Sequence, residues 1–229
     1  MKRNIATDLQ NIAKILGKYK LCVDLSPLYK AIGCLSSNGL VHLESLRLHV
    51  APAPRNTCPI VNSIDILLDV SVPLVKTDNL VLPVSDYAFN IKIMGYNQEG
   101  SRVMSSWHLD YDDSNDAEYI HPHFHLTYGG KAMEQVNLGD VLLLPAPRLV
   151  CPPMDIILGI DFALSNFVKK DVYERIRQDS QYKAAVTNAQ ITYWKPYMLS
   201  LAHFWCKNTC GNDPAWLNKS KDLCPSLLD

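Results

Sequence analysis

The sequence predicts an α+β fold: N-terminal helices, then a five- or six-stranded, mainly antiparallel sheet in meander order, then C-terminal helices packed on that sheet. Apolar side chains recur every three or four residues at both ends of the chain and alternate with polar ones in the middle. Proline, glycine and acidic clusters separate the alternating runs. The 229 residues, 48% of them hydrophobic, suit one compact domain over 1–205 and exclude a disordered chain.

The predicted N-terminal helices are amphipathic. Residues 5–19 place apolar side chains at helical spacing, namely Ile5, Leu9, Ile12, Leu16 and Tyr19. Ser26-Pro27 supplies a cap and a first-turn proline for a second short helix that runs to Ile32. No apolar run reaches the length of a membrane span or the pattern of a signal peptide. We therefore expect no membrane partner and a cytoplasmic protein with reduced cysteines.

The predicted strands follow from alternation of apolar and polar side chains. It is clearest over 46–50, 64–72 and 89–93, and it continues over 103–112 and 119–128. A sixth, more buried strand is expected over 139–145. Prolines fall between several of these runs, where no hydrogen-bond donor to a neighbouring strand is needed.

The chain is predicted to be helical again after Pro152-Pro153. A helix from Met154 to Phe167 is apolar on nearly every side, so we expect it at the centre of the fold. Asp161 within it needs a partner, and the alternatives are one of the strand histidines, the backbone or water at an exposed edge. A longer helix from Gln181 to Trp205 follows, with a kink expected at Pro196.

Four of the seven histidines are predicted to share one face of the sheet. Along 103–112 and 119–128, alternate side chains are apolar and must face the core. If these strands are neighbours joined by the acidic turn 112–116, the intervening polar side chains of both strands share the opposite face. These are His108, Asp110, Asp112, His121, His123, His125 and Thr127.

This cluster is the first candidate site, because imidazole and carboxylate groups ligate metals and transfer protons. Alternate residues of a strand lie about 6.6 Å apart, so one or two strand histidines are expected to ligate with a group from the neighbouring strand. The expected ligands of a divalent metal, zinc or manganese, are His108, Asp110, His123 and His125. The expected catalytic acid–base groups are His108, His121, His123, His125 and Asp110. The alternative is a solvated strand face without chemistry.

Arg47 and Lys92 occupy polar positions on other predicted strands. Because both carry a positive charge, we expect them to hold an anionic substrate. The first functional hypothesis is therefore a metal- or histidine-dependent hydrolase of phosphodiesters. The second is a non-catalytic adaptor that binds another protein, with at most a structural metal. The net charge of −1 gives no global attraction for nucleic acid.

The C-terminal tail, 206–229, holds a second candidate metal site. His203, Cys206, Cys210 and Cys224 are ligands of the kind that tetrahedral zinc takes. Zinc would stabilise a tail too short to fold on its own apolar area. Free thiols in a loose tail are the alternative.

Cys151 supports a third functional hypothesis. The order of a helix, an antiparallel meander, His121-Pro122 and a cysteine before closing helices loosely resembles that of ubiquitin-conjugating enzymes. The resemblance implies Cys151 as the nucleophile, and a helix N-terminus after Pro152-Pro153 would lower the pKa of its thiol. Ubiquitin-conjugating enzymes carry a His-Pro-Asn motif, and here its third residue is His123. Cys151 also lies farther from His121 than that family places its cysteine. A buried structural thiol is the alternative.

Overall fold

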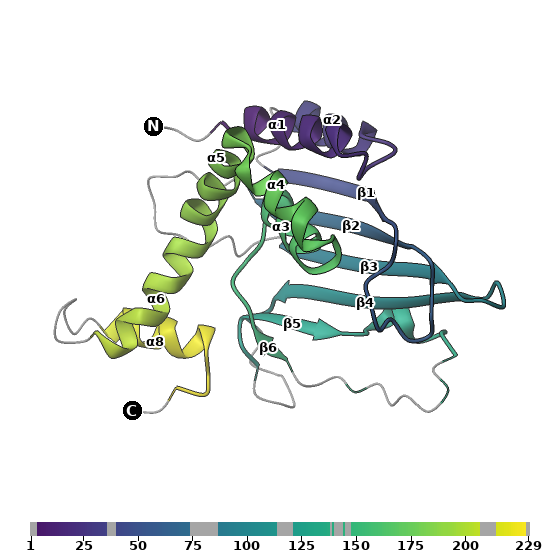
Figure 1. The fold of residues 1–229 in the computed structure, drawn as a ribbon. Coiled ribbons are helices and arrows are strands. Elements are labelled where there is room, and N and C mark those ends of the chain that lie inside the picture. The colour runs from purple at the N-terminus through teal and green to yellow at the C-terminus, as the bar shows by residue number, and fades with distance from the viewer. Residues whose placement is uncertain are drawn as a thin grey trace.

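The computed structural model describes residues 4–35, 40–73, 87–113, 121–137, 139, 144, 148–206 and 214–227. Figure 1 shows two helices beside one edge of a sheet, further helices across one of its faces, and the last helices to the left of the sheet, past the strand ends. The predicted α+β class and the order of its parts are confirmed.

The two N-terminal helices form as predicted. Helix α1 (Ile5–Lys18) begins where the Asn4 side chain accepts a hydrogen bond from the Thr7 amide, and its apolar stripe is buried. Helix α2 (Ser26–Cys34) has its proline in the first turn. Helix α1 packs against α5 and helix α2 packs against β1, so both cover the β1 edge of the sheet.

Six antiparallel strands follow in meander order within the described part of the chain, which confirms the predicted sheet. Their bounds are β1 (Leu40–Val50), β2 (Ile64–Pro73), β3 (Ala88–Tyr96), β4 (Arg102–Tyr111), β5 (Phe124–Tyr128) and β6 (Leu149–Val150). A 3-10 turn, η1 (Lys131–Met133), follows β5. The predicted sixth strand over 139–145 falls mostly outside the described residues, and the observed β6 lies just after it.

Helix α3 (Ile156–Phe167) is the central helix, as predicted. Asp155 caps its first turn by accepting from the Leu158 amide. Gly159 allows α3 to approach the sheet closely, because a Cβ at that position would lie 2.4 Å from the Phe89 ring. The helix thus packs directly over β2 and β3.

Asp161 does not meet a histidine, so that alternative is wrong. Its carboxylate accepts hydrogen bonds from the hydroxyls of Tyr182 (2.8 Å) and Tyr173 (3.0 Å) and lies 3.2 Å from Arg177. These partners belong to helices α4 (Lys170–Gln178) and α5 (Ser180–Ala189), which fold back on α3. Asp161 therefore links α3 to α4 and α5 through hydrogen bonds and an ion pair.

The predicted long helix contains an irregular turn. Helix α5 continues through a π-helical turn, η2 (Gln190–Trp194), into α6 (Lys195–Trp205), so the irregularity falls just before Pro196. Helix α8 (Pro214–Leu223) lies within the tail and packs against α6. None of the helices in the described ranges is long and apolar enough to cross a membrane.

The two faces of the sheet differ in character. Along β1 and β2 every second side chain is buried, and these side chains pack toward the helices. The intervening positions carry histidine, arginine and aspartate. We call the surface formed by those intervening positions, continued across β3 to β6, the polar face.

Candidate functional site

Strands β4 and β5 are neighbours, and this pairing gathers most of the predicted polar cluster. His108 lies opposite Thr127, and Asp110 lies opposite His125. Residues paired across antiparallel strands point to the same side of the sheet, so all four share the polar face. The pairing on which the candidate site depends is confirmed.

His121 reaches the cluster by a turn of the chain. Strand β5 begins only at Phe124, and the ring nitrogen Nδ1 of His125 lies 3.0 Å from the Pro122 carbonyl oxygen. This turn brings the His121 ring against the His125 ring, with 4.3 Å between their centroids. On a continuous strand the two residues would lie about 13 Å apart.

His123 directly precedes β5 and still pairs with β4, since its carbonyl accepts from the Asp112 amide at 2.9 Å, so its place on the face of His125 stays a prediction. Its ring meets the edge of Tyr111 at 5.5 Å, and Tyr111 in turn contacts Phe124 on the helix-covered face. The His123 amide donates to the carbonyl of Asp222 in α8 at 3.0 Å. A contact with the C-terminal helix thus fixes the backbone where the predicted strand would have continued.

Two aspartates accompany the imidazoles. Asp112 Oδ2 lies 3.6 Å from His121 Nε2, and Asp110 Oδ2 lies 3.4 Å from His108 Nε2. The turn after β5 then closes over His108: a Cβ on Gly130 would lie 3.0 Å from the His108 ring, and Gly130 has φ of +70°. Gly130 therefore lets the chain pack directly on this imidazole.

The hydrogen bond at His125 fixes which nitrogen carries its proton. A carbonyl oxygen only accepts, so Nδ1 is the donor to Pro122 and Nε2 of the neutral ring carries the lone pair. Burial lowers the pKa of His125 from its ordinary 6.5, and the nearby charges of His121 and Arg148 act in the same direction. Burial also lowers the pKa of His121, again with help from Arg148. Both imidazoles are therefore neutral at pH 7.

Two buried polar atoms here form no hydrogen bond with any described residue. They are His121 Nδ1 and the Thr127 hydroxyl oxygen. The His121 side chain is only 8% exposed and Thr127 only 6%. A buried polar atom without a partner costs free energy, typically about 1–3 kcal/mol, so two together point to a place where water or a ligand supplies the missing bonds.

Arg148 is a site residue that the sequence reasoning missed. It directly precedes β6, whose Val150 pairs with His125 and whose Leu149 pairs with Leu126. Continuing that register places Arg148 opposite Thr127 on the polar face, and its charge acts on both His121 and His125. A strand of two residues shows no alternation, so no sequence pattern marked it.

Arg47 and Lys92 lie away from the histidines. Arg47 is on β1, which is four strand spacings, or about 19 Å, from β5, and it pairs with Asp65 at 3.0 Å. Lys92 is on β3, opposite Ser106 of β4. The structure therefore does not bring either cation to the His121–His125 pair.

No three or more His, Cys, Asp or Glu side chains converge as metal ligands among the residues that the structure describes. His108 and Asp110 contact each other, but His123 faces Tyr111. In the tail, His203 is buried in the last turn of α6 and Cys224 follows α8. Cys210 lies outside the described residues, so the tail site stays a prediction.

Cys151 is not activated by a helix N-terminus, and that expectation is wrong. Helix α3 begins five residues later and is capped by Asp155. Burial raises the pKa of the Cys151 thiol to about 11. The thiol is thus protonated at neutral pH, which is the opposite of what a nucleophilic cysteine needs.

No known protein family, curated protein or solved structure is significantly similar to this chain.

Proposed function

We propose that the chain is a histidine-dependent phosphodiester hydrolase whose site lies on the polar face where β4, β5 and β6 meet. The observation that carries the proposal is the pair of buried, unpartnered atoms, His121 Nδ1 and Thr127 Oγ1, beside the neutral imidazole of His125. A neutral imidazole with a free lone pair is a general base, and unpartnered polar atoms offer hydrogen bonds to a substrate.

His125 has the central role in the proposed reaction. The oxygen of a water molecule attacks phosphorus while Nε2 of His125 takes one of the water protons. The bond from phosphorus to the leaving oxygen breaks, and the imidazolium returns its proton to that oxygen. The products are an alcohol and a phosphomonoester, and the imidazole is regenerated. Asp110, opposite His125, stabilises the transient positive charge.

Arg148 supports the choice of a phosphodiester. Its positive charge acts on the His121–His125 pair, so it can attract an anionic substrate without being neutralised by the two uncharged rings. His121 lies against the His125 ring and next to Asp112, so we assign it the role of positioning His125.

A matched pair of variants tests the proposal on bis(p-nitrophenyl) phosphate. His125→Asn keeps an amide N–H for the Pro122 carbonyl but removes Nε2, so kcat/KM should fall about 10²- to 10⁴-fold. His49→Asn changes an exposed histidine on β1 and should leave kcat/KM unchanged. Equal rates for His125→Asn and wild type, with both folded by circular dichroism, would sink the proposal.

A divalent metal, zinc or manganese, is a second form of the same proposal. It would act as a Lewis acid at the polar face or as a structural ion in the tail. Elemental analysis of the wild type, His123→Ala and Cys210→Ala tests it. Metal lost only from Cys210→Ala would assign it to the tail, and metal lost only from His123→Ala would assign it to the polar face.

A non-catalytic adaptor is the second candidate function. The observation that favours it is a set of large exposed apolar side chains along the end of α5–α6, namely Ile191, Met198, Leu199 and Trp205. Helical apolar surface of this kind is typical of contacts with another helix. With a second copy of this chain as the partner, sedimentation of the full chain should show self-association that Met198→Glu abolishes.

We also propose a cytoplasmic location. Among the described residues, Cys22, Cys58, Cys151 and Cys224 are free thiols, which suits a reducing compartment. The ubiquitin-conjugating alternative requires a reactive Cys151, and the raised pKa of that thiol argues against it.

A further inference from the structure

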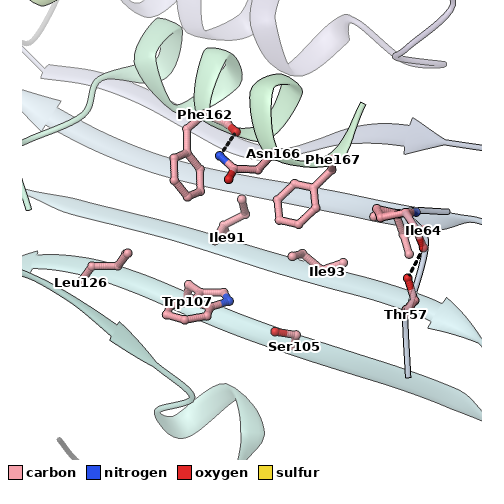
Figure 2. Close-up of a pocket in the computed structure, with 11 residues that line it drawn as sticks. Thr57, Ile64, Ile91, Ile93, Ser105, Trp107, Leu126, Phe162, Asn166 and Phe167 are labelled. Carbon is pink, nitrogen blue, oxygen red and sulfur yellow. Dashed lines mark hydrogen bonds between the residues drawn. The ribbon is translucent and has the colours of Figure 1, made fainter. Parts of the chain in front are cut away.

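A groove of about 520 Å³ lies on the helix-covered face of the sheet, opposite the polar face. Helix α3 supplies one wall with Phe162 and Phe167, as Figure 2 shows. Strands β3 to β5 supply the floor, and Thr57 from the β1–β2 connection lies at one end. Pro54 of the same connection also lines the groove. The groove lies between α3, which packs over β2 and β3, and the side chains that β4 and β5 present on the same face.

The walls of this groove are rigid. Its floor is a hydrogen-bonded sheet in which Ile91 pairs with Trp107 and Ile93 pairs with Ser105. The Trp107 ring is held by the Tyr128 ring, with 4.9 Å between centroids. Helix α3 is fixed by the hydrogen bonds that Asp161 accepts from α4 and α5. A preformed site of this volume is in the range that holds one small organic molecule.

Among the residues that the structure describes, none that lines the groove carries a charge. An ionised ligand would therefore lose its hydration without gaining a counter-charge, which is strongly unfavourable. The aromatic rings of Trp107, Phe162 and Phe167 instead offer flat apolar surfaces that suit a planar ring.

Three polar groups give the groove some specificity. The Asn166 amide nitrogen donates to the Phe162 carbonyl (2.8 Å) and the Ser165 hydroxyl (3.3 Å), which leaves its oxygen as an acceptor. Figure 2 shows this oxygen on the side of Asn166 that faces the sheet. The Trp107 indole N–H and the Ser105 hydroxyl lie on the floor and add a donor and a second donor or acceptor.

The size of the groove decides between a small molecule and a protein partner. Eleven residues line it, whereas a standard protein interface uses about 20–30 residues on each side. The β1–β2 connection also lies at one end of the groove. A ligand that fills it is thus a single compact molecule.

We propose that this groove is a binding site for an uncharged, planar heteroaromatic molecule, stacked between Trp107 and the phenyl rings of α3 and hydrogen-bonded to Asn166. This site is separate from the proposed hydrolase site and does not depend on it, because the two lie on opposite faces of the sheet.

Two fluorescent probes that differ in charge test the proposal on the full chain. N-phenylnaphthylamine is uncharged and aromatic, and anilinonaphthalene sulfonate is a similar molecule with a negative charge. The uncharged probe should bind saturably, with one molecule per chain and a Kd on the order of micromolar. The sulfonate should bind at least about tenfold more weakly, because the lining offers no cation.

Substitutions locate the binding. Ser105→Ile fills the floor and should weaken binding of the uncharged probe at least about tenfold. Ser71→Ile makes the same change on the polar face and should not alter binding. Trp107→Phe should reduce energy transfer from tryptophan to the bound probe, which reports the location without filling the groove.

Three results would overturn the proposal: no saturable binding of the uncharged probe, equal affinity for both probes, or undiminished energy transfer in Trp107→Phe. The Trp107→Phe measurement also decides the matter if Ser105→Ile does not fold.

Discussion

The two ends of the polar face both carry histidine, arginine and aspartate, but the histidines are exposed and paired at one end and buried at the other. At the β1–β2 end, His49 and Arg47 both pair with Asp65, at 2.9 and 3.0 Å, and their side chains are 44% and 57% exposed. At the β4–β6 end, His121 and His125 are buried, and His121 Nδ1 has no partner among the described residues.

This difference shows that residue type alone does not make a site. The β1–β2 group is a satisfied surface ion-pair network of the kind that contributes little to stability or function. The β4–β6 group carries a burial cost that its own hydrogen bonds do not offset. We infer function at the second end because unsatisfied burial needs a reason, and the predictions below test that inference.

The largest expected difference concerns the two arginines. Arg148→Gln should lower kcat/KM for a phosphodiester about 100-fold, because it removes the charge proposed to hold the anionic phosphoryl oxygens. Arg47→Gln is the matched change at the β1–β2 end and should alter kcat/KM by less than about twofold. Equal losses in the two variants would contradict the assignment of Arg148.

The next effect concerns the turn that packs on His108. Gly130→Ala should lower the free energy of unfolding by about 1–3 kcal/mol, since the methyl group would collide with the imidazole and φ is positive. Gly100 also has positive φ but open space around it, so Gly100→Ala should cost only the backbone strain, about 1 kcal/mol. Urea denaturation measures both, and an equal cost would show that the contact with His108 is unimportant.

The buried pair should also make stability depend on pH. The folded chain holds His121 and His125 neutral, with pKa values below 6.5, whereas in the unfolded chain they titrate near 6.5. Below pH 6.5 the unfolded state thus binds more protons, so the free energy of unfolding falls as pH falls through the folded pKa values, and above 6.5 these groups add no pH dependence. His125→Asn should flatten this slope and His49→Asn should not, in urea titrations between pH 7.5 and 5. The same slope in all three proteins would argue against the lowered pKa values.

The smallest effect is expected at Thr127. Thr127→Val keeps the side-chain shape and removes an unpartnered hydroxyl, so stability should be unchanged or rise by up to about 1 kcal/mol. If that hydroxyl contacts substrate, the same variant should raise KM in the hydrolase assay. A clear loss of stability would mean that the hydroxyl already has a partner in the folded protein, and the argument from unsatisfied burial would fail there.

The sequence predicted the parts of the site that follow strand periodicity. His108, Asp110, His125 and Thr127 share a face because side chains alternate along paired strands, and that alternation is readable from residue order. The α+β class, the meander and the central helix followed from the same periodicities.

The remaining features depend on contacts between distant segments. The His123 amide donates to the Asp222 carbonyl of α8, and His121 reaches His125 through the turn next to this contact. Arg148 belongs to a connection without periodicity, and Asp161 is satisfied by helices that return to it from later in the chain. None of these partners is visible in local sequence.

The protonation state of His125 tests the account most directly. Two-bond ¹H–¹⁵N correlation spectra across a pH titration report both the tautomer and the pKa of each imidazole. We expect His125 to carry its proton on Nδ1 and to titrate below pH 6.5, while remaining neutral at pH 7. A proton on Nε2 would turn the lone pair toward the Pro122 carbonyl and leave none for a substrate, and a pKa at or above 6.5 would show that burial does not favour the neutral ring. Either result would contradict the account.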